Sequence, residues 1–287
     1  MNEITTEEGP NRDQISFWNS DAASKWVEFN EVLDHRLKSY SDLVMGRANP
    51  APGDHVLDVG CGCGGTTLDL AARVAPGGTV TGLDVSVPML ALARERSEAA
   101  GFATTFINAD AETHALPAAS YDLLFSRFGV MFFSNPKVAF ANFHGALKSG
   151  GRAAFVCWRE PKYNPWVTVP FEAARPFAPD FEPPKGDAPG QFSFAREGWV
   201  EEILSDAGFI NIQIAQHDTT ERVGDGDLDS CVELMLKLGP VARLLREVNT
   251  DLVPAITAAV REVVAPHYDG KCIALAGSVW IVAANRQ

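Results

Sequence analysis

The chain has few cysteines and no grouped metal ligands. Five cysteines are scattered over 287 residues, which is too few for a disulfide framework, and they lack the spacing of a four-ligand zinc site. Cys61 and Cys63 lie in a glycine-rich segment, where we expect small buried thiols. The six histidines show no motif that marks a general base. We therefore predict no metal, and the catalytic residue, if there is one, is unknown.

Basic residues are also scarce. Lys and Arg number 24 against 37 acidic residues, the formal net charge is -13, and no dense basic run occurs. Because nucleic-acid binding depends on Lys and Arg at phosphates, we expect no nucleic-acid partner. No apolar run reaches membrane-spanning length, and the first residues lack the basic and apolar regions of a signal peptide. We expect no membrane partner and a cytoplasmic location.

What is present is a regular alternation of strand and helix patterns from residue 55 onward. This alternation predicts a doubly wound, Rossmann-like α/β fold, with a largely parallel sheet covered on both faces. The predicted strands are residues 55–59, 79–84, 103–108, 121–126, 152–157, 210–216 and 273–284. The predicted helices are residues 66–74, 88–100, 136–147 and 197–207, preceded by two helices within residues 14–45.

The segment Val-Leu-Asp-Val-Gly-Cys-Gly-Cys-Gly-Gly-Thr, from Val56 to Thr66, supports two interpretations. Gly60, Gly62 and Gly65 satisfy the G-x-G-x-x-G spacing of a dinucleotide site, which holds a pyrophosphate. An acid-x-G-x-G-x-G spacing is also satisfied, and its carboxylate, Asp58, would face a cationic ligand. The first interpretation predicts an NAD(P)-dependent oxidoreductase.

Three carboxylates near the ends of predicted strands favour the second interpretation. Asp84 suits the ribose of any adenosine compound, and Asp110 is placed to accept a hydrogen bond from the adenine amine. Asp58 would repel a pyrophosphate and attract an ammonium or a sulfonium. The loop therefore favours a cationic adenosine compound.

Four motifs in order resemble the class I S-adenosylmethionine-dependent methyltransferases. They are Val-Leu-Asp-Val-Gly-Cys-Gly-Cys-Gly, Gly-Leu-Asp-Val-Ser, Asn-Ala-Asp-Ala-Glu and Leu-Lys-Ser-Gly-Gly-Arg, spread over residues 50–160. The resemblance implies S-adenosyl-L-methionine as cofactor and a seven-stranded sheet whose last strand, 273–284, is antiparallel. It implies a methionine site at Asp58, Gly60, Cys61 and Gly62, a ribose site at Asp84, Val85 and Met89, an adenine site at Asp110 and Ala111, and a methyl-facing group at Ser126, Arg127 and Phe128.

Further segments look similar to a small-molecule branch, related to ubiquinone and menaquinone C-methyltransferases and to natural-product N- and O-methyltransferases. They are Ser-Arg-Phe-Gly-Val-Met-Phe-Phe, Cys-Trp-Arg-Glu, Asn-Pro-Trp and the N-terminal Phe-Trp-Asn. Phe17, Trp18 and Trp26 would form an aromatic lid on the sulfonium, or the apolar seam of a helix. Trp158, Asn164 and Trp166 are candidate substrate contacts. Arg127 would bind a carboxylate, or form a surface salt bridge.

The resulting organisation has four parts. They are an N-terminal helical lid (1–50), a cofactor-binding core (51–158), a proline- and aromatic-rich cap (159–195), and the rest of the core (196–287) with a helical insertion at 228–264. The function expected is in-line methyl transfer to O, N or C of a small acceptor, with an aromatic or hydrophobic character suggested by the cap. A non-catalytic cofactor-binding regulatory protein stays a further alternative. The apolar helical insertion is compatible with a homo-oligomer.

Overall fold

The computed structural model describes residues 9–184 and 186–287, which form two compact units. The first unit contains the chain up to Trp158, Gly186–Gln216 and Trp280–Gln287. The second unit contains residues 159–184 and 217–279. Most of the segment predicted as a cap therefore shares one unit with the predicted helical insertion.

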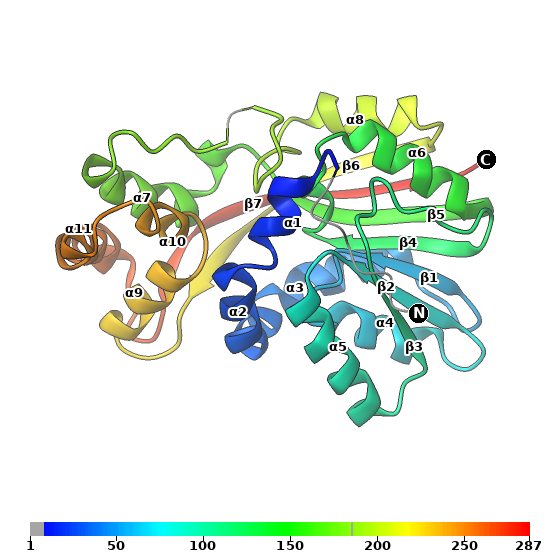
Figure 1. Cartoon of the computed structure of the whole chain (residues 1–287), viewed down its shortest axis with the longest axis horizontal. Helices are drawn as coiled ribbons and strands as arrows, with labels where there is room; N and C mark the ends of the chain where they lie inside the picture. Colours follow the sequence, from blue (N-terminus) through cyan, green and yellow to red (C-terminus); the bar gives the residue numbers. More distant parts are fainter. Residues whose placement is uncertain (1–8, 185) are drawn as a thin grey trace. The chain divides into compact units, whose positions relative to one another are not determined.

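A seven-stranded sheet with the order β3-β2-β1-β4-β5-β7-β6 organises the fold (Figure 1). The strands are β1 (His55–Val59), β2 (Thr79–Asp84), β3 (Thr104–Asn108), β4 (Tyr121–Arg127), β5 (Leu147–Trp158), β6 (Ile210–Val223) and β7 (Ile273–Asn285). Neighbours from β3 to β5 are parallel. Gly150 bonds to Arg286 and Arg159 to Ser278, so β7 runs antiparallel to β5. The predicted Rossmann-like fold with an antiparallel last strand is confirmed.

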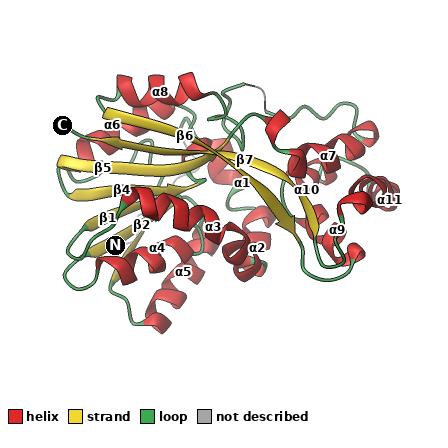
Figure 2. Cartoon of the chain, turned by 180° about the vertical axis from the view of Figure 1, so that it is seen from behind, coloured by secondary structure: helices red, strands yellow, loops and turns green. Residues whose placement is uncertain are grey.

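Helices cover both faces of this sheet. One face carries α3 (Asn30–Ala48), α4 (Gly65–Val74) and α5 (Val87–Ala100), seen in front in Figure 2. The other face carries α6 (Pro136–Ala146) and α8 (Glu197–Asp206), in front in Figure 1. Side-chain caps start two of these helices, because Ser86 accepts from the Met89 amide and Asn135 from the Val138 amide. Strand order reverses between β1 and β4, which is where α/β sheets usually bind ligands.

The N-terminal segment forms three helices where the sequence predicted two. They are α1 (Arg12–Phe17), α2 (Asp21–Glu28) and α3. The hydroxyl of Ser20 accepts a hydrogen bond from the Ala22 amide and starts α2. The prediction was wrong because the break is a short polar segment, Asn19 to Asp21, without a proline or glycine to mark it.

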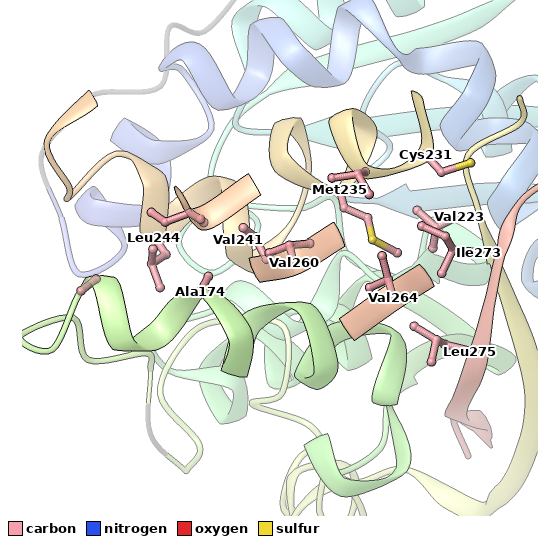
Figure 3. Close-up of a cluster of buried hydrophobic side chains, with 13 residues drawn as sticks. Ala174, Val223, Cys231, Met235, Val241, Leu244, Val260, Val264, Ile273 and Leu275 are labelled. Atoms are coloured by element: carbon pink, nitrogen blue, oxygen red, sulfur yellow. The ribbon is translucent and has the colours of Figure 1, made fainter. Parts of the chain in front are cut away.

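The second unit has an apolar core of its own. Its helices are α7 (Pro165–Ala174), α9 (Leu228–Lys237), α10 (Pro240–Leu245) and α11 (Val253–Val264). They pack on one cluster of buried side chains, which includes Met235, Leu244, Val260 and Leu275 (Figure 3). The segment after β5 showed no period in the sequence, yet it contains α7. Within residues 9–184 and 186–287, no helix has both the length and the apolar character needed to cross a membrane.

Candidate active site

The glycine loop and the acid at the end of β2 are bonded to each other. Asp84 accepts a hydrogen bond from the Gly62 amide through Oδ2 and one from the Ser86 amide through Oδ1, both at 2.8 Å. Because β1 and β2 are parallel and adjacent, their carboxyl ends bring the loop and this acid to one edge. Burial raises the pKa of Asp84, against the opposing effect of these backbone donors.

Backbone geometry explains the glycines of the loop. Gly60 has φ +66°, and a Cβ there would lie 2.6 Å from the Cα of Gly129. Gly62 has φ +53°, and its added Cβ would only touch the sulfur of Met89 at 3.8 Å. The first glycine therefore permits a close backbone contact, and the second a left-handed turn. Cys61 between them is buried, as expected, whereas Cys63 is only half-buried.

Asp58 lies beneath the loop. Its side chain is fully buried, and Oδ2 accepts hydrogen bonds from Thr66 and Thr67 at 2.7 Å each. Its Oδ1 has no hydrogen-bond partner in the described part of the chain. Burial raises the pKa of Asp58 to about 6, although the two threonines act in the opposite direction. This unmatched oxygen is an acceptor for a cationic donor or a water.

A second carboxylate, Asp34 of α3, lies next to the first residue of α4; it was not identified from the sequence. Both oxygens of Asp34 lie 2.4 Å from where a Cβ on Gly65 would be. Gly65 is the third glycine of the dinucleotide spacing and the first residue of α4. Its missing side chain therefore makes room for the protein's own carboxylate, in the region where a dinucleotide site places a pyrophosphate. No motif in α3 marks Asp34.

The N-terminal segment contacts the loops that follow β2 and β3. The Asn19 amide group donates to the Val85 carbonyl at 3.0 Å, and its oxygen accepts from the Val87 amide at 2.9 Å. The Asn11 side chain donates to Asp110 at 3.4 Å. Asp110 also accepts from the Glu112 amide at 3.0 Å. Ala111, between these acids, is buried.

The three N-terminal aromatic residues pack against one another. Trp18 meets Phe17 and Trp26 edge to face, with ring centroids 5.0 and 5.7 Å apart. It also meets Phe132, which follows β4, at 5.2 Å. Phe17, Trp18 and Trp26 are all half-buried. The lid and the helix-seam interpretations both stay compatible with this packing.

The residues at the end of β4 are engaged in internal contacts. Ser126 is fully buried, donates to the Val59 carbonyl at 2.7 Å and accepts from the Gly129 amide at 3.1 Å, which joins β4 to the glycine loop. Phe128 has φ +61° and stacks on Trp158, with centroids 4.5 Å apart and an interplanar angle of 9°. Both rings are nearly buried.

Arg127 lies in an internal ion pair. It donates to Asp34 at 2.9 Å and to the hydroxyl of Ser41 at 3.1 Å, and its side chain is 13% exposed. The sequence was compatible with a surface salt bridge for Arg127. The structure shows a partly buried ion pair instead.

Comparison with known proteins agrees with this geometry. Residues 56–151 match a family model described as a methyltransferase domain. Nocamycin O-methyltransferase of Saccharothrix syringae is 30% identical over 201 residues, which cover 67% of this chain and 69% of that protein. The chain belongs to the class I S-adenosylmethionine-dependent methyltransferases.

Two other similarities are narrower. Demethylmenaquinone methyltransferase of Thermus thermophilus is 37% identical over 132 residues, which cover 46% of this methyltransferase and 57% of that protein. The YcgJ protein of Bacillus subtilis shares the fold, with a TM-score of 0.57 and 17% identity over 86% of this chain and 97% of that one. The first similarity supports the family, and the second shows the fold alone.

Two predicted substrate contacts of this methyltransferase lie in the second unit. Asn164 is fully buried and donates to the Arg159 and Ser278 carbonyls at 3.1 and 3.2 Å. Its side-chain oxygen accepts from the Ser278 amide at 2.9 Å and from Trp166 Nε1 at 3.2 Å. Asn164 thus ties the start of α7 to β7. Over the described residues, no group of three histidine, cysteine or acidic residues is arranged to hold a metal.

Proposed function

We propose that this methyltransferase binds S-adenosylmethionine against the glycine loop, Asp84 and Asp110, and methylates O, N or C of a small organic acceptor. The observation that carries the proposal is the buried carboxylate of Asp58 beneath the glycine loop. Its Oδ1 has no hydrogen-bond partner among the described residues, and its charge would repel the pyrophosphate that the rival NAD(P) interpretation needs. A ligand with an ammonium and a sulfonium fits an acid-rich loop better.

The chain's own groups fit each part of this cofactor. Each oxygen of Asp84 uses one backbone donor and keeps lone-pair capacity for a ribose hydroxyl. Asp110 would accept from the adenine amine, with Ala111 beside it, and Val85 and Met89 would flank the ribose. The unmatched Oδ1 of Asp58 would accept from the ammonium, directly or through water.

When bound, the cofactor supplies an electrophilic methyl group, whose in-line displacement mainly needs an aligned and desolvated acceptor. The residues that would exclude water are aromatic. Phe17, Trp18 and Trp26 contribute from the N-terminal helices, and Phe128 and Trp158 from the ends of β4 and β5. These groups would position the acceptor and exclude water from it rather than transfer protons.

The acceptor is proposed from the relatives of the chain. The aromatic residues of the cap add no support, because Trp166, Phe171, Phe177 and Phe181 pack against the apolar core of the second unit and Phe194 is buried. Relatives are named for methylating nocamycin at oxygen and demethylmenaquinone, which supports a small organic acceptor and leaves the atom open.

The first test is binding of S-adenosylmethionine, S-adenosylhomocysteine and NADH by isothermal titration, with wild type and Asp84→Asn. We expect the wild type to bind both sulfur compounds. The variant should weaken S-adenosylhomocysteine binding roughly 10- to 100-fold, because hydrogen bonds to a charged group are lost. Asp122→Asn is the matched control, since Asp122 bonds to the His55 amide and Lys148 at the opposite end of the sheet. Binding of NADH alone would overturn the proposal.

A further inference from the structure

Asp34 bridges two arginines that come from different elements. Its Oδ2 accepts from Arg96 of α5 and its Oδ1 from Arg127 of β4, both at 2.9 Å. The three side chains are only 13–27% exposed, so water screens them less than a surface pair. Asp34 therefore neutralises one of two positive charges in a partly buried environment.

The same group of charges is attached to the glycine loop. Arg96 donates to the Cys63 carbonyl at 2.8 Å, inside the loop. Arg127 is close enough to Asp58 for its charge to lower the pKa of that acid, against the larger effect of burial. Asp34 itself touches Gly65, where the loop becomes α4. A change of charge at Asp34 would therefore change the electrostatic potential at the glycine loop.

We propose that Asp34 is a positioning residue that sets the charge beside the glycine loop and so determines how strongly the site prefers the sulfonium of S-adenosylmethionine to the neutral sulfur of S-adenosylhomocysteine. This inference rests on the proposed function. With Asp34 in place, the group carries two positive charges and one negative charge. Without it, two unbalanced guanidinium groups oppose a cationic cofactor.

The two ligands separate this effect from general loss of binding. Both carry the same adenosine, ammonium and carboxylate, and they differ in charge only at sulfur. A merely structural role of Asp34 would weaken both ligands equally. A role in charge balance changes the ratio of their dissociation constants.

The experiment is isothermal titration of both ligands with wild type, Asp34→Asn and the double variant Asp34→Asn/Arg127→Gln. We expect Asp34→Asn to lower the preference for S-adenosylmethionine about fivefold, the order expected for one unit charge whose effect is partly screened. The double variant has the wild-type net charge and should restore the preference. The control is Asp42→Asn, on the same helix, whose carboxylate pairs with exposed Lys38 and Arg73 and should leave the ratio unchanged.

Each result has one meaning. An unchanged ratio in Asp34→Asn, or a ratio that the double variant does not restore, would overturn the role of Asp34. If Asp34→Asn does not fold, Arg127→Gln alone still tests the idea, because it should raise the preference for S-adenosylmethionine, and an unchanged or lower preference would refute it. A wild type that binds neither ligand would overturn the proposed function instead.

Discussion

Asp58 is the residue whose environment departs most from that of an ordinary acid. It is fully buried, half of its carboxylate has no partner in the described chain, and burial raises its pKa to about 6. A folded-state pKa above the unfolded value stabilises the protein below about pH 4, and this stabilisation is lost as pH rises through 6. At neutral pH, the ionised group therefore lowers the free energy of unfolding.

Asp58→Asn should remove that dependence. Relative to wild type, the variant should gain on the order of 1 kcal/mol in free energy of unfolding between pH 5.0 and pH 7.5. Urea unfolding at the two pH values measures the difference. Asp69→Asn, which changes a half-exposed acid on α4, should show no such trend. Equal differences at both pH values for Asp58→Asn would contradict the assignment.

At the scale of elements, Asn19 links the short helices α1 and α2 to the rest of the first unit. Asn19 lies between them and makes three hydrogen bonds, to the Ile15 and Val85 carbonyls and from the Val87 amide. Val85 directly follows Asp84, and Val87 lies two residues further on. Asn19 therefore links these helices to the segment that follows the proposed ribose-binding acid.

Asn19→Ala should make S-adenosylhomocysteine dissociate about fivefold faster, because roughly 1 kcal/mol of net hydrogen bonding between the N-terminal helices and the segment after Asp84 is lost. Stopped-flow displacement measures this rate. Asn30→Ala serves as the control, because Asn30 donates to the nearby Val27 carbonyl. If both variants behave alike, Asn19 has no special part in retaining the cofactor.

At the scale of the whole molecule, the division into two units predicts which segments cofactor binding protects from hydrogen exchange. All proposed cofactor contacts lie in the first unit, whereas residues 228–264 pack into the separate apolar core of the second. In hydrogen exchange, S-adenosylhomocysteine should slow exchange in residues 58–66, 84–90 and 108–112 and leave residues 228–264 unchanged. Protection of equal size in residues 228–264 would contradict this assignment of roles.

Much of the core was predictable because its rules are local. The bounds predicted for β1 and β2 match the structure, since each strand is a short apolar run between turn residues. The extra break before α2 and the helix α7 were not predicted. Ser20 is an ordinary cap residue with no proline or glycine near it, and the proline-rich surroundings of α7 conceal its period.

The sequence by itself determined the sheet, the glycine loop, the order of the acids and the family, because all of these depend on neighbours along the chain. Only the tertiary structure decided which charges meet. Asp34, Arg96 and Arg127 lie 93 residues apart at the extremes, and only the packing of α3, α5 and β4 joins them. The same packing engaged Ser126 in internal hydrogen bonds and Arg127 in an ion pair. Side-chain pairing across distant elements depends on three-dimensional distance, which no local pattern of residues encodes.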